Sequence, residues 1–170
     1  MKINTIVYTS NTGYTAQYAQ MLGEKTGLPV WELASRQAPK ASDILYHGWL
    51  MAGNIQGYKK AARDYRIRAV VAVGMSATGS QADYLRKNNA IPEEVPLYPV
   101  QGGFDLDRLH GVYKLMMTIM KNTAGKGLAD KADRTPDEDA LLDLLQNGGS
   151  RVNAENLDGI LAWYEENKQA

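Results

Sequence analysis

The sequence INTIVYTSNTGYT, residues 3–15, joins a short apolar run to a turn of hydroxyl, amide and glycine residues. Residues 3–8 are rich in β-branched side chains, which is typical of a buried strand. Between residues 12 and 25, Tyr18, Ala19 and Leu22 recur at the spacing of one helix face. A strand that runs through a short polar loop into a helix is half of a βαβ unit. The stretch therefore predicts an α/β fold with a parallel sheet.

Four further strand-like runs follow, and segments of helical periodicity separate them. These runs are residues 30–33, 43–48, 69–74 and 96–101. Alternation of strands with helices predicts that all five strands are parallel neighbours in one sheet. The chain has 170 residues, of which 44% are hydrophobic, so we expect residues 1–170 to form one domain with a substantial core.

The carboxyl-terminal half is predicted to carry further helices. Apolar side chains recur at helical spacing and predict a face that packs on the sheet: Leu106, Leu109, Tyr113, Met116 and Met120. Residues 123–134 turn polar and contain two glycines, so we expect a surface excursion there, within a longer excursion over residues 123–150.

Helix-capping residues mark three helix starts. Ser80 is followed by Asp83 at the spacing of a capping box, and Thr135 precedes a proline and two acids. Gly148 and Gly149 are expected to end the helix that starts at Thr135, and Asn153 is expected to cap the last helix.

Composition limits the possible chemistry. Lysine plus arginine and aspartate plus glutamate number 19 each, so no overall charge favours nucleic acid. The chain has no cysteine, which leaves redox chemistry to a bound organic cofactor, and its two histidines have no companions at metal-ligand spacing. No apolar run approaches the roughly 20 residues that span a bilayer. We therefore expect no integral membrane segment, and with no leader-like amino terminus we expect a cytoplasmic protein.

The loop after the first strand has the composition of an anion site. Backbone N–H groups at a helix start, the positive helix end and nearby hydroxyls can together surround a phosphate without lysine or arginine. The candidate residues are Ser10, Asn11, Thr12, Gly13, Tyr14 and Thr15. The alternative is that Ser10 or Thr12 merely caps the helix.

The same stretch resembles the flavodoxin signature from strand to helix. The matching residues are Ile6, Val7, Tyr8, Ser10, Gly13, Thr15, Ala19 and Leu22. The resemblance implies a flavodoxin-like three-layer αβα sandwich, with a five-stranded parallel sheet of order 2-1-3-4-5 and bound FMN. Neither the Gly-x-Gly of a dinucleotide fold nor the Gly-Lys-Ser/Thr of a P-loop is present, and Thr9 and Ser10 replace the acids of a receiver domain.

Two further loops correspond to those that enclose the flavin ring in flavodoxins. The first is Trp49, Leu50, Met51, Ala52, Gly53 and Asn54, and the second is Met75, Ser76, Ala77, Thr78 and Gly79. Trp49 is either a stacking residue or core, whereas glycine permits close approach and a peptide flip near residues 52–54. The second loop has no aromatic residue, which leaves one flavin face open to a substrate or partner.

The carboxyl half is similar to the menaquinone-dependent protoporphyrinogen dehydrogenase group. The resemblance rests on Ala52-Gly53, the loop at 75–79, the turn at 101–104 and the segment 113–121. It implies two-electron chemistry with a quinone acceptor at the membrane surface. Three interpretations stay open: an FMN electron carrier with a redox partner protein, an FMN-dependent oxidoreductase acting on a quinone or porphyrinogen, and a flavin-binding regulatory module.

Overall fold

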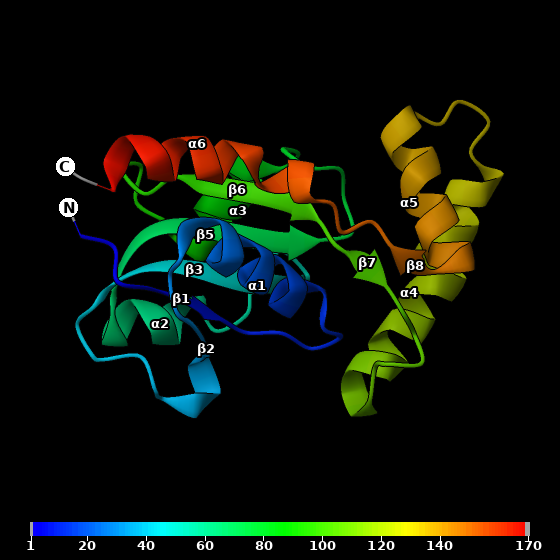
Figure 1. Ribbon diagram of the computed structural model, residues 1–170. Coiled ribbons are helices and arrows are strands. Elements are labelled where there is room, and N and C mark those ends of the chain that lie inside the picture. The colour runs from blue at the N-terminus through cyan, green and yellow to red at the C-terminus, as the bar shows by residue number, and fades with distance from the viewer. Residues whose placement is uncertain (1, 169–170) are drawn as a thin grey trace.

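A central parallel sheet organises the molecule. The computed structural model describes residues 2–168. The five parallel strands are β1 (Thr5–Tyr8), β2 (Val30–Glu32), β3 (Asp43–Met51), β5 (Arg66–Gly74) and β6 (Leu97–Gln101). Their order is β2-β1-β3-β5-β6, which confirms the predicted 2-1-3-4-5 arrangement of the five parallel strands (Figure 1).

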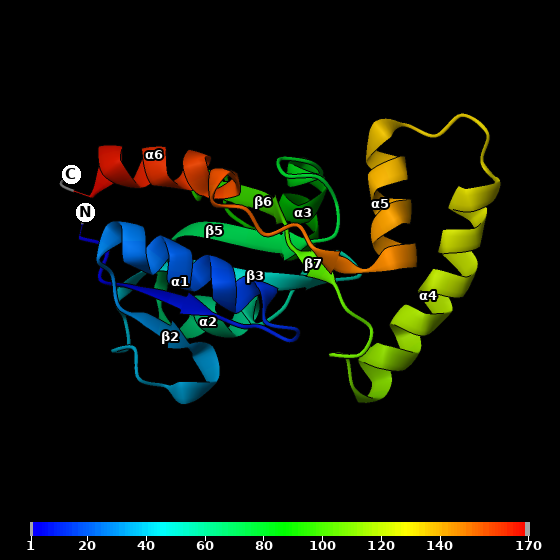
Figure 2. The ribbon, with the colours of Figure 1, turned by 45° about the vertical axis from the view of Figure 1, so that its right-hand side comes forward.

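Helices cover both faces of the sheet and create two separate cores. On one face lie α1 (Tyr14–Thr26) and α6 (Asp158–Asn167), where Tyr18, Leu22 and Ile160 pack against the sheet. On the other lie α2 (Tyr58–Asp64) and α3 (Ala82–Asn89), with Tyr58 and Leu85 buried. Side chains alternate between these faces along each strand. The result is a three-layer αβα sandwich of flavodoxin-like topology (Figures 1 and 2).

Strand β3 runs three residues beyond the predicted end at Gly48. Its continuation pairs antiparallel with β4 (Asn54–Ile55). The two residues between them, Ala52 and Gly53, both have positive φ, 48° and 75°. Positive φ at both central positions is the requirement of a two-residue hairpin turn whose twist matches its strands. The turn thus extends β3 past the end of the sheet core.

The helix after β5 starts differently from the prediction. We expected Ser80 and Asp83 to form a capping box, but α3 begins at Ala82 and its N-cap is Gln81, with φ 61°. The Ser80 hydroxyl instead donates to the Ala77 carbonyl at 2.6 Å. A serine can satisfy a local turn as readily as a helix start, and here the turn prevails.

A helical hairpin is inserted between β6, the last strand of the parallel sheet, and the last helix, α6. A two-stranded ribbon, β7 (Gly103–Phe104) paired with β8 (Gly149–Ser150), forms its root. From this root α4 (Gly111–Asp130) and α5 (Pro136–Asn147) project beyond the carboxyl end of the sheet, as Figures 1 and 2 show.

The prediction that the apolar face packs on the sheet was wrong. Leu106, Leu109, Tyr113 and Met120 instead join a separate core with α5, formed around Phe104, Leu144 and Leu145, and Met116 is 43% exposed. Residues 123–130 lie in the projecting hairpin, where we expected an excursion, and they continue α4 although Gly125 and Gly127 are poor helix formers. Gly125 is buried against α5, where Leu145 Cδ1 lies 4.0 Å from the position a Cβ would take. Packing with the second helix therefore outweighs the weak local propensity.

The caps predicted for α5 are confirmed, whereas Asn153 caps the 3-10 turn before α6 and not α6 itself, whose N-cap is Leu157. Thr135 and Glu138 form a reciprocal capping box at the start of α5, and Gly148 ends that helix. The Asn153 side chain accepts the Glu155 N–H at 3.1 Å and caps η2 (Ala154–Leu157), a 3-10 turn that leads into α6. A second 3-10 turn, η1 (Leu33–Ser35), follows β2.

In residues 2–168, none of the helices has both the length and the apolar composition that crossing a bilayer requires.

Candidate functional site

The loop between β1 and α1 is held in shape by side chains of its own and from β3. Ser10 Oγ accepts the N–H groups of Gly13 at 3.2 Å and Ala16 at 3.3 Å. Gly13 has φ 95°, a conformation that glycine adopts without strain. Thr9 Oγ1 donates to the Gln56 carbonyl at 2.7 Å and lies 3.1 Å from the Tyr46 hydroxyl. Ser10 thus organises the loop through its side chain.

This loop presents hydrogen-bond donors with no acceptor. In the part of the chain that the structure describes, the backbone N–H groups of Asn11, Thr12, Tyr14 and Thr15 make no hydrogen bond to protein. Thr15 is only 2% exposed, and within residues 2–168 its hydroxyl has no protein partner either. Unpaired N–H groups together with the positive end of a helix form an anion-binding concavity.

A cleft that is open to solvent adjoins the loop. It lies at the carboxyl ends of β1, β3 and β5, where ligands bind in open parallel sheets. Its walls beyond the loop are formed by Trp49, Leu50, Met51, Val73, Gly74, Met75, Gly103, Phe104, Asp105, Leu109 and Met117. The cleft therefore combines a polar, donor-rich end with a mostly apolar body.

The cleft brings together eight of the seventeen residues predicted for the site. They are Asn11, Thr12, Tyr14, Thr15, Trp49, Leu50, Met51 and Met75. Ser10 and Gly13 shape the loop without lining the cleft. The other seven, residues 52–54 and 76–79, lie outside it.

The turn at residues 52–54 is directed towards α3. The Gly53 carbonyl accepts from Asn88 Nδ2 at 2.8 Å and from Asn89 Nδ2 at 2.9 Å. Asn89, 4% exposed, also accepts the Ile55 N–H through Oδ1 at 2.8 Å. Two side chains of α3 therefore set the position of these three residues. Met51, directly before them, is the last residue of this segment that lines the cleft.

The loop after β5 turns towards β6. The Thr78 hydroxyl donates to Asn156 Oδ1 at 2.8 Å and accepts the Gln101 N–H at 3.0 Å. The Gly79 N–H donates to the Pro99 carbonyl at 2.9 Å. Ser76 and Ala77 line a separate, smaller hollow. Of the residues 75–79, all of which the structure describes, Met75 alone lines the cleft.

The inserted hairpin closes the opposite side of the cleft, a role that the sequence analysis missed. Tyr113 of α4 packs edge-on against Trp49, and Met117 lines the cleft. The Tyr14 hydroxyl donates to the Gly149 carbonyl at 3.4 Å, which ties α1 to the root of the hairpin. The helical periodicity of residues 106–120 carried this signal, but periodicity reports an apolar face without identifying what the face packs against.

His47 lies beneath the site and not in it. Its side chain is fully buried on β3, and among the described residues 2–168 neither ring nitrogen finds a hydrogen-bond partner. Burial lowers the pKa of His47 from 6.5 to about 3, so the ring is neutral at ordinary pH. His47 is therefore a core side chain whose ring is neutral. Within residues 2–168, no three His, Cys, Asp or Glu side chains gather to hold a metal ion.

The arrangement fits a phosphate ester attached to a flat, largely apolar group. The free N–H groups and the Thr15 hydroxyl match phosphate oxygens, and the wall around Trp49 matches the flat group. Comparison of the sequence with protein-family models gave no match, and comparison with curated proteins gave none.

Proposed function

We propose that this chain binds FMN noncovalently and transfers electrons through it, as a member of the flavodoxin-like proteins. The observation that carries the proposal is the set of four backbone N–H groups that have no partner in the described part of the chain and lie at one end of a mostly apolar cleft. A site of this kind binds a phosphate through the backbone and a ring system through its walls.

The chain's own residues have separable roles in this proposal. The N–H groups of Asn11, Thr12, Tyr14 and Thr15, with the hydroxyls of Thr12 and Thr15, hold the phosphate. Trp49, Leu50 and Met51 on one side and Met75 on the other border the ring and keep water from it. FMN, when bound, supplies one-electron or two-electron chemistry. The pinned turn at Gly53 keeps the end of the Trp49 wall in place.

The first candidate for the electron donor or acceptor is a redox partner protein, in a cytoplasmic setting. The cleft is open along the loop after β5, so an electron can enter or leave there without a large movement of the chain. A flavin-binding regulatory module would use the same site but without electron transfer.

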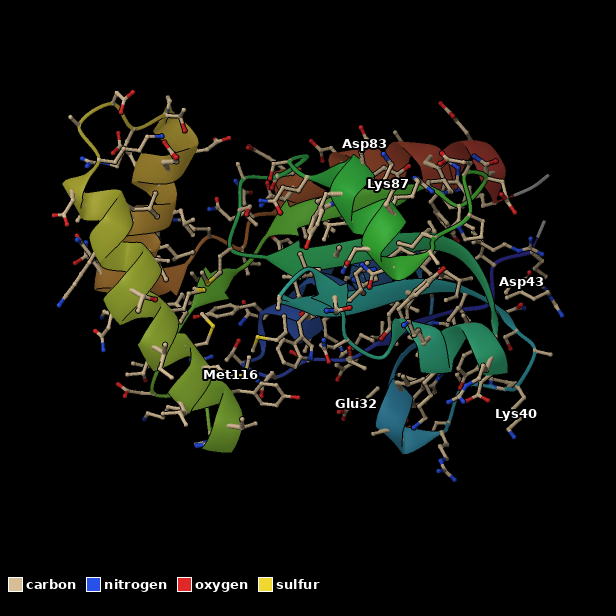
Figure 3. All side chains as sticks on the ribbon, turned by 180° about the vertical axis from the view of Figure 1, so that it is seen from behind. Glu32, Lys40, Asp43, Asp83, Lys87 and Met116 are labelled. Atoms are coloured by element: carbon tan, nitrogen blue, oxygen red, sulfur yellow. The ribbon has the colours of Figure 1, made fainter. Side chains whose placement is uncertain are left out.

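The second candidate is an FMN-dependent oxidoreductase with a quinone or porphyrinogen substrate. One observation favours it: four apolar side chains of α4 lie in a stripe on solvent, Val112, Leu115, Met116 and Ile119, with exposures of 61%, 61%, 43% and 53%. The same helix contributes Met117 to the cleft. An exposed apolar stripe beside a cleft suits an apolar substrate or peripheral contact with a membrane. Met116 is seen on this helix in Figure 3.

The test is a flavin titration followed by stepwise anaerobic reduction. We expect FMN fluorescence to be quenched at a stoichiometry of one, and the visible spectrum of the complex to change with each addition of reductant. Uptake of electrons one at a time favours the carrier, and uptake in pairs followed by turnover with a quinone or porphyrinogen favours the oxidoreductase. Absence of saturable FMN binding overturns the proposal.

A further inference from the structure

Arg108 reaches the phosphate-binding loop from the root of the inserted hairpin. Its Nη1 donates to the Thr12 carbonyl at 3.3 Å. The same atom lies 3.8 Å from the position that a Cβ on Gly13 would occupy. The side chain is 56% exposed, so its remaining N–H groups are open to solvent on the side of the loop. A residue 96 positions away in sequence thus places a cation beside the free N–H groups.

Asp105 holds the guanidinium in this position. Its Oδ2 is 3.0 Å from Arg108 Nε, and its Oδ1 accepts the backbone N–H groups of Asp107 at 3.0 Å and Arg108 at 3.3 Å. A carboxylate that bonds both the turn and the guanidinium restricts where Arg108 can point. Arg108 is therefore oriented by its own segment before any ligand arrives.

The orientation of Arg108 affects the charge that a ligand meets in the cleft. Among the cleft-lining residues that the structure describes, Asp105 is the only charged one. A phosphate bound at the loop would carry up to two negative charges close to this carboxylate, which disfavours binding. Arg108 offsets the carboxylate and adds donors with the fork geometry that suits phosphate oxygens.

We propose that Arg108 is a phosphate ligand that completes the loop site, exchanging the Thr12 carbonyl for an oxygen of the phosphate when the ligand binds. The inference rests on the proposed FMN function for the identity of the ligand, whereas the preference for an anion rests on the position of Arg108 beside the free N–H groups of the loop. Because Arg108 belongs to the inserted segment, occupancy of the phosphate site is coupled to the position of the hairpin root.

The test compares FMN with riboflavin, which lacks the phosphate. In Arg108→Gln we expect FMN affinity to fall about tenfold or more, the loss of one charge-assisted contact, while riboflavin affinity changes less than about twofold. Arg66→Gln is the matched control, because Arg66 is 57% exposed and paired with an aspartate, Asp43. Figure 3 places Asp43 at the end of the molecule away from α4. An equal loss for both flavins, or no loss for FMN, overturns the inference.

A second measurement separates this inference from the proposed function. Inorganic phosphate is titrated into the wild-type protein and Arg108→Gln while the backbone amide signals of Thr12 and Thr15 are followed by NMR. We expect saturable shifts in the wild type at a phosphate concentration several times lower than in the variant. If the protein shows this difference in phosphate binding but binds no flavin, the FMN proposal is overturned and the role of Arg108 is supported. Identical titrations of the two proteins overturn that role.

Discussion

The indole ring of Trp49 meets the ring of Tyr113 edge-on, with the ring centroids 5.2 Å apart and the planes at 82°. Trp49 is near the end of β3 and Tyr113 is in the first turn of α4, so this contact joins the sheet to the inserted hairpin at the cleft. Edge-to-face aromatic pairs contribute about 0.5 to 1.5 kcal/mol beyond the area they bury. The orientation of the Trp49 wall therefore depends on the hairpin as well as on the sheet.

The first prediction concerns Trp49→Ala. Removal of the indole admits water to the ring site, which favours the anionic reduced flavin, so we expect the midpoint potential of bound FMN to rise by about 10 to 30 mV. The contribution of the phosphate, measured as the ratio of FMN to riboflavin affinity, should stay the same. Trp31→Ala is the control, because Trp31 is on the edge strand β2 and does not line the cleft. An unchanged potential in Trp49→Ala contradicts a contact between Trp49 and the flavin.

The second prediction concerns the hydroxyls of the loop. Thr15→Val keeps the shape of a side chain that is 2% exposed but removes its donor, and Thr12→Val removes the hydroxyl of a half-buried side chain three residues earlier in the loop. Each should weaken FMN binding by about 1 to 3 kcal/mol, the value of a hydrogen bond to a charged group. The measurement is a fluorescence titration, with riboflavin as the control ligand. Undiminished FMN affinity in both variants contradicts a phosphate site at this loop.

The third prediction separates two adjacent amides of α3. Asn89 is buried, accepts the Ile55 N–H and donates to the carbonyls of Gly53 and Leu85. Asn88 is exposed, and its side chain contacts only the turn, at the Gly53 carbonyl and the Asn54 side chain. Truncating Asn89 leaves the Ile55 N–H buried without a partner, so Asn89→Ala should lower the free energy of unfolding by about 2 to 3 kcal/mol. Asn88→Ala should lower it by about 0.5 kcal/mol. Chemical denaturation measures both, and equal losses contradict a special role for Asn89.

Local sequence determines the sheet because strand and helix periodicities follow one another along the chain. The β-branched run at residues 69–74 and the loop at 9–15 each contain their own signal, and both lie where expected. The end of β3 does not follow from local sequence, because Ala52 adopts a positive φ that an alanine rarely adopts without support from surrounding structure. The hairpin pairing of Leu50 with Ile55 stabilises that turn, and such pairing is a tertiary property.

The candidate site likewise has one part that local sequence predicts and one part that depends on tertiary packing. The loop donors follow from residues 10–15, whereas Arg108 and Tyr113 enter the site through the hairpin, whose packing depends on contacts such as Gly125 with Leu145. Sequence periodicity identified an apolar face on α4 but assigned it to the sheet. Local patterns do not encode a contact made across about 100 residues of chain.

The last prediction concerns His47 and pH. Its pKa is about 3 in the folded chain against 6.5 when unperturbed, because burial disfavours the charged ring. Between these values the unfolded chain binds a proton that the folded chain does not. The free energy of unfolding should therefore fall as pH drops below 6.5, by up to about 1.4 kcal/mol per pH unit.

The range from pH 6.5 to pH 5 isolates this contribution. The carboxyl of Asp43, whose pKa is lowered chiefly by its hydrogen bond to Arg66, loses its stabilising charge only at more acidic pH. His47→Leu removes the titrating ring and both of its nitrogens. The free energy of unfolding of this variant should therefore stay nearly constant over this pH range. His110→Gln, at an exposed position, should retain the wild-type slope. Denaturant titrations at four pH values measure these slopes, and a wild-type slope in His47→Leu would show that another group controls the acid sensitivity.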